Sequence, residues 1–194
     1  YEFRGYGIDP DDAHDMLLEV EDILVKSWTT ENYKHDGKYW QVELPTLRPQ
    51  VYQKPHPLMI RACSGLASTL EMAREGRPFL MNLQSDETTR ERMDMYRSTM
   101  SEAGFDDEAV ARSVTDSWVW RNIFVADTDA EAEAIAVPHF RAMRAYLSDN
   151  RARMNTEQER AAQAAAVIGA ARDSVDHGLI YGSPETVSQR LKEV

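Results

Sequence analysis

Apolar and polar positions follow a helical period in the first part of the chain. Between residues 9 and 28, apolar side chains recur every three or four positions, and Met16 and Ile23 share one face. Asp9 is a suitable N-cap residue, and Pro10 suits the first helical position because its missing N–H has no intrahelical partner there. The pattern therefore predicts a helix over residues 9–28.

A β-hairpin is the clearest local signal in the sequence. Asp36-Gly37 lies between two runs that favour strands, and this dipeptide is typical of a two-residue turn. The pattern predicts a hairpin over residues 33–42, with its turn at Asp36-Gly37 and His35 exposed beside the turn. Four prolines between residues 45 and 57 then exclude regular structure, so we expect an extended connection there.

Strands and helices alternate from residue 58 onwards. Runs of apolar, β-branched or aromatic residues predict strands at Leu58–Ala62, Phe79–Asn82 and Ser117–Asp127. Helical periods occupy Ser68–Glu75, Ser85–Ala103, Thr128–Leu147 and Thr156–Val175. Pro138 should kink or split the third of these helices. The alternation is typical of βαβ units with a parallel sheet. A separate sheet of three parallel strands is a poor match for so many helices. A segment of a (β/α)8 barrel is therefore the better interpretation.

The charge and composition of the chain exclude some classes of partner. The formal net charge is −11 over 194 residues, whereas nucleic-acid binding needs clustered Lys and Arg, so we expect no nucleic-acid partner. The hydrophobic content of 42% is sufficient for a buried core. No apolar run approaches the roughly 18 residues of a membrane helix, and no secretory signal is visible. We therefore expect no membrane contact and a cytoplasmic location.

Two features suggest reactive or metal-binding groups, and both have simpler interpretations. Cys63 is the only cysteine in the sequence, so an internal disulfide is impossible. No helper base is apparent near it, and we interpret it as a small packing residue. His14, Asp15 and Glu19 have the residue types of a metal cluster. A solvated acidic helix face explains them better, so no metal site is predicted.

The best candidate for a binding site lies in the stretch MIRACSGLASTLEMAREG, Met59 to Gly76. Small residues stand where a strand meets a helix, and they let a ligand approach the backbone. The helix start offers unpaired N–H groups and positive dipole charge, and Ser64, Ser68 and Thr69 add hydroxyl groups that suit a phosphate. Ser64 or Ser68 is equally acceptable as an ordinary helix cap, and the spacing leaves both interpretations open.

Five motifs in order resemble the bacterial luciferase-like, flavin-dependent monooxygenases. They are YEFRGYGID with the helix ending EDILVKSW, the hairpin ending GKYW, the run RPQVYQKPHPLMIRACS, the segment FVADTDAEAEA, and YGSPETVSQRL. The resemblance covers nearly the whole chain. It implies a TIM barrel as a single domain over residues 1–194, incomplete because the first strands and the last are expected to be missing. The chain begins at Tyr1, and the apolar face of its last helix stops at Val194, as this interpretation expects.

The resemblance also implies a cofactor site. In this family the turn after the fifth strand holds the phosphate of FMN. By position, this role falls on Ser64, Gly65, Ser68 and Thr69. The end of the next strand should face the flavin ring, where Met81 suits the ring face and Asn82 can form hydrogen bonds with its edge. Met81 would also suit the core.

Aromatic residues on the third predicted strand extend the candidate site. Trp118 and Trp120 have the same parity and share one face, which is either core or pocket wall. Arg121 points to the other face, outward or into a salt bridge.

The implied activity is oxygenation of a small organic substrate by reduced FMN and molecular oxygen. A separate flavin reductase is a candidate source of the reduced cofactor, and a homodimer is expected. Catalytic residues are not assigned, and the chain alone is expected to be inactive, because the missing first half normally supplies much of the ring contact. Two alternatives stay open, a deazaflavin-dependent hydride-transfer oxidoreductase on the same scaffold and a non-catalytic flavin-binding relative.

Overall fold

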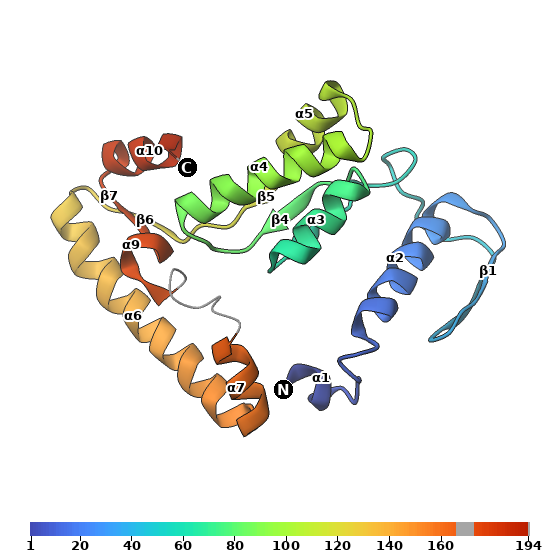
Figure 1. Cartoon of the computed structure of the whole chain (residues 1–194), viewed down its shortest axis with the longest axis horizontal. Helices are drawn as coiled ribbons and strands as arrows, with labels where there is room; N and C mark the ends of the chain where they lie inside the picture. The colour runs from blue at the N-terminus through green and yellow to red at the C-terminus, as the bar shows by residue number, and fades with distance from the viewer. Residues whose placement is uncertain (166–172, 194) are drawn as a thin grey trace. The chain divides into compact units, whose positions relative to one another are not determined.

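The structure, a computed structural model, describes residues 1–165 and 173–193 (Figure 1). Contacts within the chain group into two compact units, Tyr1–Met59 and Ile60–Val194. Each unit has its own helices and strands and is described by itself. None of the described helices combines the length and apolar character that crossing a membrane requires.

The first unit contains helix α1 (Glu2–Gly5) and helix α2 (Ala13–Thr29), followed by a hairpin. Helix α2 begins four residues later than the sequence predicts. The reason is local, because the Asp9 carboxylate accepts a hydrogen bond from the Asp11 N–H at 3.0 Å and forms a turn that includes Pro10. Asp9 therefore caps this turn and not the helix.

The predicted hairpin is confirmed, but its turn lies elsewhere. Strand β1 (Tyr33–Asp36) pairs antiparallel with strand β2 (Gln41–Leu44), with Asp36 opposite Gln41. The Gly37 N–H donates to the Trp40 carbonyl at 3.0 Å, so the tip is Lys38-Tyr39. The prediction of a turn at Asp36-Gly37 is wrong because contacts with α2, described below, fix the tip.

Parallel strand pairs organise the second unit. Strands β3 (Arg61–Cys63), β4 (Phe79–Met81) and β5 (Trp118–Val119) form one parallel sheet in the order β3-β4-β5. Strand β6 (Ile123–Val125) pairs in parallel with β7 (Ile180–Gly182). The α/β class with parallel pairing is confirmed, and no closed sheet forms among the described residues.

Three strand predictions need correction. Strand β3 begins three residues after the predicted Leu58, because the extended connection continues that far. The predicted strand Ser117–Asp127 is two short strands with different partners, since β5 pairs with β4 and β6 pairs with β7. Strand β7 was not predicted, because Gly182 and a helix start directly follow its short apolar run and its pairing with β6 defines it.

Helices follow the strands in chain order. Their bounds are α3 Leu66–Arg74, α4 Asp86–Glu102, α5 Asp107–Thr115, α6 Asp129–Met154, α7 Glu157–Ala165, α9 Val175–Gly178 and α10 Pro184–Glu193. Helix α5 was missed by the sequence analysis. The predicted helix Thr156–Val175 is confirmed over α7, and its residues 166–172 lie outside the described residues.

Helix α6 passes through Pro138 as one helix of 26 residues, so the prediction of a split is wrong. Proline removes one backbone hydrogen bond from a helix. Val137 and Phe140, on either side of it, are buried in a cluster with Leu179. This packing offsets the lost hydrogen bond and keeps the helix continuous.

The core of the second unit lies where α3 and α4 pack near β3 and β4. Its fully buried members are Cys63, Met72, Ala73, Phe79, Met81, Tyr96 and Met100. The interpretation of Cys63 as a packing residue is confirmed, and burial raises the pKa of its thiol. The core thus lies directly behind the β3–α3 turn.

Candidate functional site

Helix α3 begins directly after the turn that follows β3, and its N-terminus has no side-chain cap. Gly65 is the N-cap residue, and no side chain makes a capping hydrogen bond there. The first turn of α3 also contains no acidic residue. Unpaired N–H groups and the positive end of the helix dipole favour an anion at such a position.

The other helices of the unit differ from α3 in this respect. The side chain of Ser85 caps α4, that of Asp106 caps α5, and that of Thr128 caps α6. Each of these three helices also has acidic residues in its first turn. Among the described helices of eight or more residues in this unit, α7 and α10 likewise have hydroxyl caps, from Thr156 and Ser183. Among the described helices of the second unit, α3 alone has no side-chain cap, and α1 and α2 of the first unit also have none.

The N-terminus of α10 is closed by a carboxylate of the chain itself. Asp129 accepts hydrogen bonds from the Ser183 N–H at 2.6 Å and the Thr186 hydroxyl at 2.9 Å. These bonds lower the pKa of the Asp129 carboxyl. Gly182 has φ +150°, and a Cβ atom there would lie 2.8 Å from the Asp129 carboxylate. The Ser183 N–H at the start of α10 therefore already has a partner in this carboxylate.

Hydroxyl groups of α3 lie beside its N-terminus. Ser64 is exposed and Ser68 is partly buried, whereas Thr69 is fully buried. The hydroxyls of Ser68 and Thr69 both donate to the Gly65 carbonyl, at 3.0 and 3.1 Å. The alternative that Ser64 or Ser68 is the N-cap is therefore wrong. The interior position of Thr69 suits support of the turn better than contact with a ligand.

The residues at the end of β4 are divided between core and surface. Met81 is fully buried in the core, which favours its structural interpretation. Asn82 is partly buried, and its side-chain oxygen Oδ1 accepts a hydrogen bond from the side-chain amide of Gln84 at 2.8 Å. Trp118 and Trp120 are 62% and 58% exposed, so neither belongs to the core of the described chain.

Arg121 links the β5–β6 segment to the start of α4. Its guanidinium group donates to Asp86 at 3.3 Å and to the Thr89 hydroxyl at 3.1 Å, with the side chain 6% exposed. The salt bridge that the sequence analysis gave as one alternative is confirmed. Because Asp86 and Thr89 belong to the first turns of α4, this contact holds in place the loop that contains Asn82.

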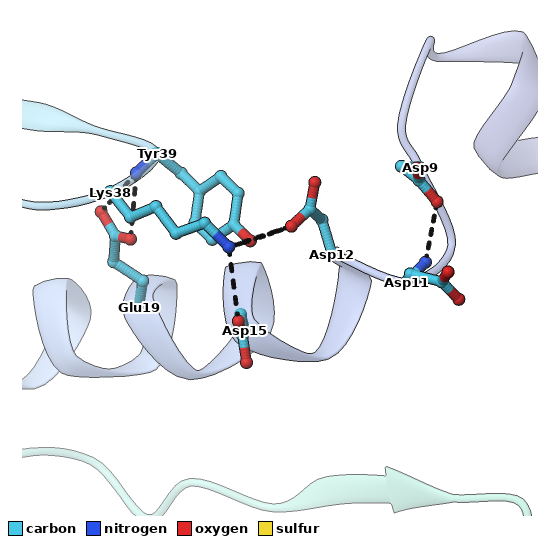
Figure 2. A network of polar contacts seen from close by, with 7 residues as sticks. All are labelled: Asp9, Asp11, Asp12, Asp15, Glu19, Lys38 and Tyr39. Carbon is cyan, nitrogen blue, oxygen red and sulfur yellow. Dashed lines mark hydrogen bonds and ion pairs between the residues drawn. The ribbon is translucent and has the colours of Figure 1, made fainter.

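The acidic residues of α2 form a contact with the hairpin and not a metal site. Figure 2 shows the Glu19 carboxylate facing the backbone of Tyr39, and Lys38 between Asp12 and Asp15. Glu19 accepts hydrogen bonds from the N–H groups of Tyr39 and Trp40, at 3.1 and 3.0 Å. Among the described residues, no group of three or more His, Cys, Asp or Glu could hold a metal ion.

Glu19 and His35 therefore lie in surroundings that the sequence analysis did not expect. The Glu19 carboxylate contacts the His35 ring at 3.0 Å, and both side chains are largely buried. The predictions of a solvated Glu19 and an exposed His35 are wrong, because the hairpin folds onto α2. Burial raises the pKa of Glu19, but the hydrogen bonds from His35, Trp40 and Tyr39 outweigh it and hold the pKa below its usual 4.5.

The hairpin contact should depend on pH. A carboxyl group whose pKa is lowered by folding stabilises the fold above its usual pKa, and this stabilisation is lost as the pH falls through the folded pKa. We expect Glu19→Gln to reduce hydrogen-exchange protection of the Tyr39 and Trp40 amides at neutral pH. The difference from wild type should shrink below about pH 4.5. Glu31→Gln, at an exposed position of the same unit, is the control. A difference that is constant with pH would contradict this role.

Comparisons with known proteins agree with the motifs in the sequence. A family model described as luciferase-like monooxygenase matches residues 1–194. The chain is 28% identical over 139 residues to an FMNH2-dependent dimethylsulfone monooxygenase of Pseudomonas putida, which covers 70% of the chain and 36% of that protein.

Two solved structures are similar in fold. The monooxygenase RslO1 of Streptomyces bottropensis has a TM-score of 0.64 at 21% identity, over 99% of this chain and 53% of that one. The oxygenating constituent of 3,6-diketocamphane monooxygenase of Pseudomonas putida, solved in complex with FMN, has a TM-score of 0.62 at 22% identity, over 92% of this chain and 52% of that one. The chain thus spans about half the length of these structures.

Proposed function

Because the chain belongs to the luciferase-like monooxygenase family, we propose that its protein oxygenates a small organic substrate with reduced FMN and molecular oxygen. The family match is supported by the relative that is 28% identical, which is an FMNH2-dependent monooxygenase. The observation in this chain that supports a phosphate-bearing flavin most directly is the uncapped N-terminus of α3.

The β3–α3 turn fits the phosphate of FMN. The group would lie at the start of α3, where backbone N–H groups and the helix dipole favour a dianion. Ser64 is exposed and Ser68 lies one turn into the helix, so their hydroxyls are available to a phosphate after a rotation. Gly65 has open space around its Cα, since a Cβ atom there would meet nothing within 4 Å. Thr69 would stabilise the turn through the hydrogen bond from its hydroxyl to the Gly65 carbonyl.

The flavin ring would lie toward the end of β4. Asn82 offers an amide that can donate to or accept from the ring edge. Met81 would lie behind the flavin ring as part of the core, because its side chain is fully buried. When bound, reduced FMN supplies the reducing equivalents that activate oxygen. The residues of this chain would fix its phosphate and orient the ring.

Several further properties belong to the same proposal. The complete protein would fold as a TIM barrel of the luciferase-like type in which residues 1–194 form part of one domain. It would act as a homodimer in the cytoplasm and receive reduced FMN from a separate flavin reductase. Catalytic residues would come from the part of the barrel that these residues do not include.

The proposed activity can be tested on the full-length protein with a flavin reductase, FMN and labelled molecular oxygen. Candidate substrates are those named for similar proteins, such as sulfones and bicyclic ketones. We expect the label to enter an organic product only when FMN and reductase are both present. Turnover should require FMN, and turnover with a reduced deazaflavin in place of FMN and reductase would contradict the proposal.

A further inference from the structure

Arg92 is a cation close to the β3–α3 turn that no motif in the sequence indicates. It lies in the second turn of α4, and its guanidinium group donates to the Ser64 carbonyl at 3.4 Å. This long hydrogen bond is the one polar contact of the side chain among the described residues. A guanidinium group has five N–H donors, and most of those of Arg92 meet no acceptor of the described chain.

Arg92 has no carboxylate partner among the described residues, unlike most of the buried or partly buried arginines of the second unit. Of the six buried or partly buried arginines described from Ile60 onwards, four pair with an acidic residue, and Arg92 and Arg151 have no such pair among the described residues. These pairs are Arg61 with Glu71, Arg77 with Glu75, Arg121 with Asp86 and Arg144 with Asp173. A partly buried charge without a counter-charge is costly, so an external anion would stabilise it.

Partial burial affects the pKa of the Arg92 side chain. Desolvation lowers the pKa of the Arg92 guanidinium from its usual range, because no nearby carboxylate offsets it. The group nevertheless keeps its positive charge at any physiological pH. A positive charge is therefore held against the backbone of Ser64, at the residue that follows β3.

We infer that Arg92 binds the phosphate group of the cofactor together with the N-terminus of α3. This inference rests on the proposed function, because it takes the phosphate to be that of FMN. Arg92 would contribute a charge-assisted hydrogen bond from α4, opposite the backbone N–H groups of α3. The residue would then select a phosphate-bearing flavin over a neutral one. The ligand chemistry is a phosphate monoester, which both FMN and free phosphate supply.

The test compares FMN, riboflavin and inorganic phosphate by calorimetry on the full-length protein. Arg92→Gln should weaken FMN binding about ten- to a hundredfold, which corresponds to one hydrogen bond to a charged group. Riboflavin binding should stay unchanged. Arg92→Lys should restore part of the loss because it keeps the charge. Arg97→Gln on the same helix is the matched control, since that residue is exposed and paired with Asp94.

Each outcome separates this inference from the function on which it rests. If wild type prefers FMN to riboflavin and Arg92→Gln keeps the same preference, the role of Arg92 is overturned and the flavin site stands. If wild type binds both flavins equally, the proposed function itself fails at this site. If inorganic phosphate binds as tightly as FMN, the site serves free phosphate and the inference is also overturned. An unchanged melting midpoint in the Arg92→Gln variant excludes misfolding as the cause.

Discussion

Replacing Gly65 by aspartate is expected to weaken FMN binding strongly while leaving the fold intact. Gly65 has an extended φ of −124°, and a Cβ atom there meets nothing within 4 Å, so the new side chain fits without strain. The carboxylate would cap α3 and stabilise it by about 0.5 kcal/mol. It would also repel a bound phosphate by about 4 kcal/mol at 4 Å with the effective dielectric of a protein surface. FMN affinity should fall by about a hundredfold or more.

The matched control for this variant is Gly65→Asn. Asparagine is an equally good N-cap and nearly the same size, but it has no charge. It should therefore lose only part of the affinity that the aspartate variant loses. Melting curves and FMN titrations of both variants separate stability from binding. Equal affinity losses in the two variants would assign the effect to the cap itself, and no loss in either would place the phosphate elsewhere.

Phe79→Ala is expected to destabilise the second unit strongly. Phe79 is fully buried in the middle strand of the β3-β4-β5 sheet, and its ring centroid lies 4.8 Å from that of Tyr96. Removing a buried aromatic side chain of this kind costs about 3–5 kcal/mol. This loss is a large part of the stability of an ordinary domain. Denaturant unfolding followed by circular dichroism measures it.

The control for the core variant is an exposed aromatic position. Phe3→Ala changes the same residue type at a side chain that is 48% exposed, so its effect should stay within about 0.5 kcal/mol. If Phe79→Ala is as mild as Phe3→Ala, the packing of β4 against α4 is not the main source of stability in this unit.

The sequence predicted those elements whose signals are local and long. Helix α4 was placed within one residue at each end, because Ser85 caps it and Tyr96 and Met100 repeat on one face. The hairpin was found but its register was not, because Glu19 fixes the tip from another element. Strand β7 is defined by its pairing with β6, a distant contact that its own short segment does not indicate. Errors therefore concentrate where a distant contact or a short element decides the structure.

The candidate site was likewise predicted only in part from the sequence. Small polar residues after an apolar run indicated the β3–α3 turn from the sequence alone, and the structure shows that its helix lacks a side-chain cap. Burial of Thr69 was not predicted, because it depends on how α3 packs against its neighbours. The core position of Met81 was one of the two interpretations that the sequence left open. Arg92 was missed because it lies 28 residues from Ser64 and nothing in its own segment marks it.

The central claim is that the β3–α3 turn holds the phosphate of a flavin, and a comparison of FMN with riboflavin by calorimetry tests it most directly. The two ligands share the same ring system and differ in the phosphate group. Each hydrogen bond to the phosphate should contribute about 1.5–3 kcal/mol, so two such bonds predict that FMN binds about a hundredfold more tightly or better. Equal affinities for FMN and riboflavin would contradict the claim.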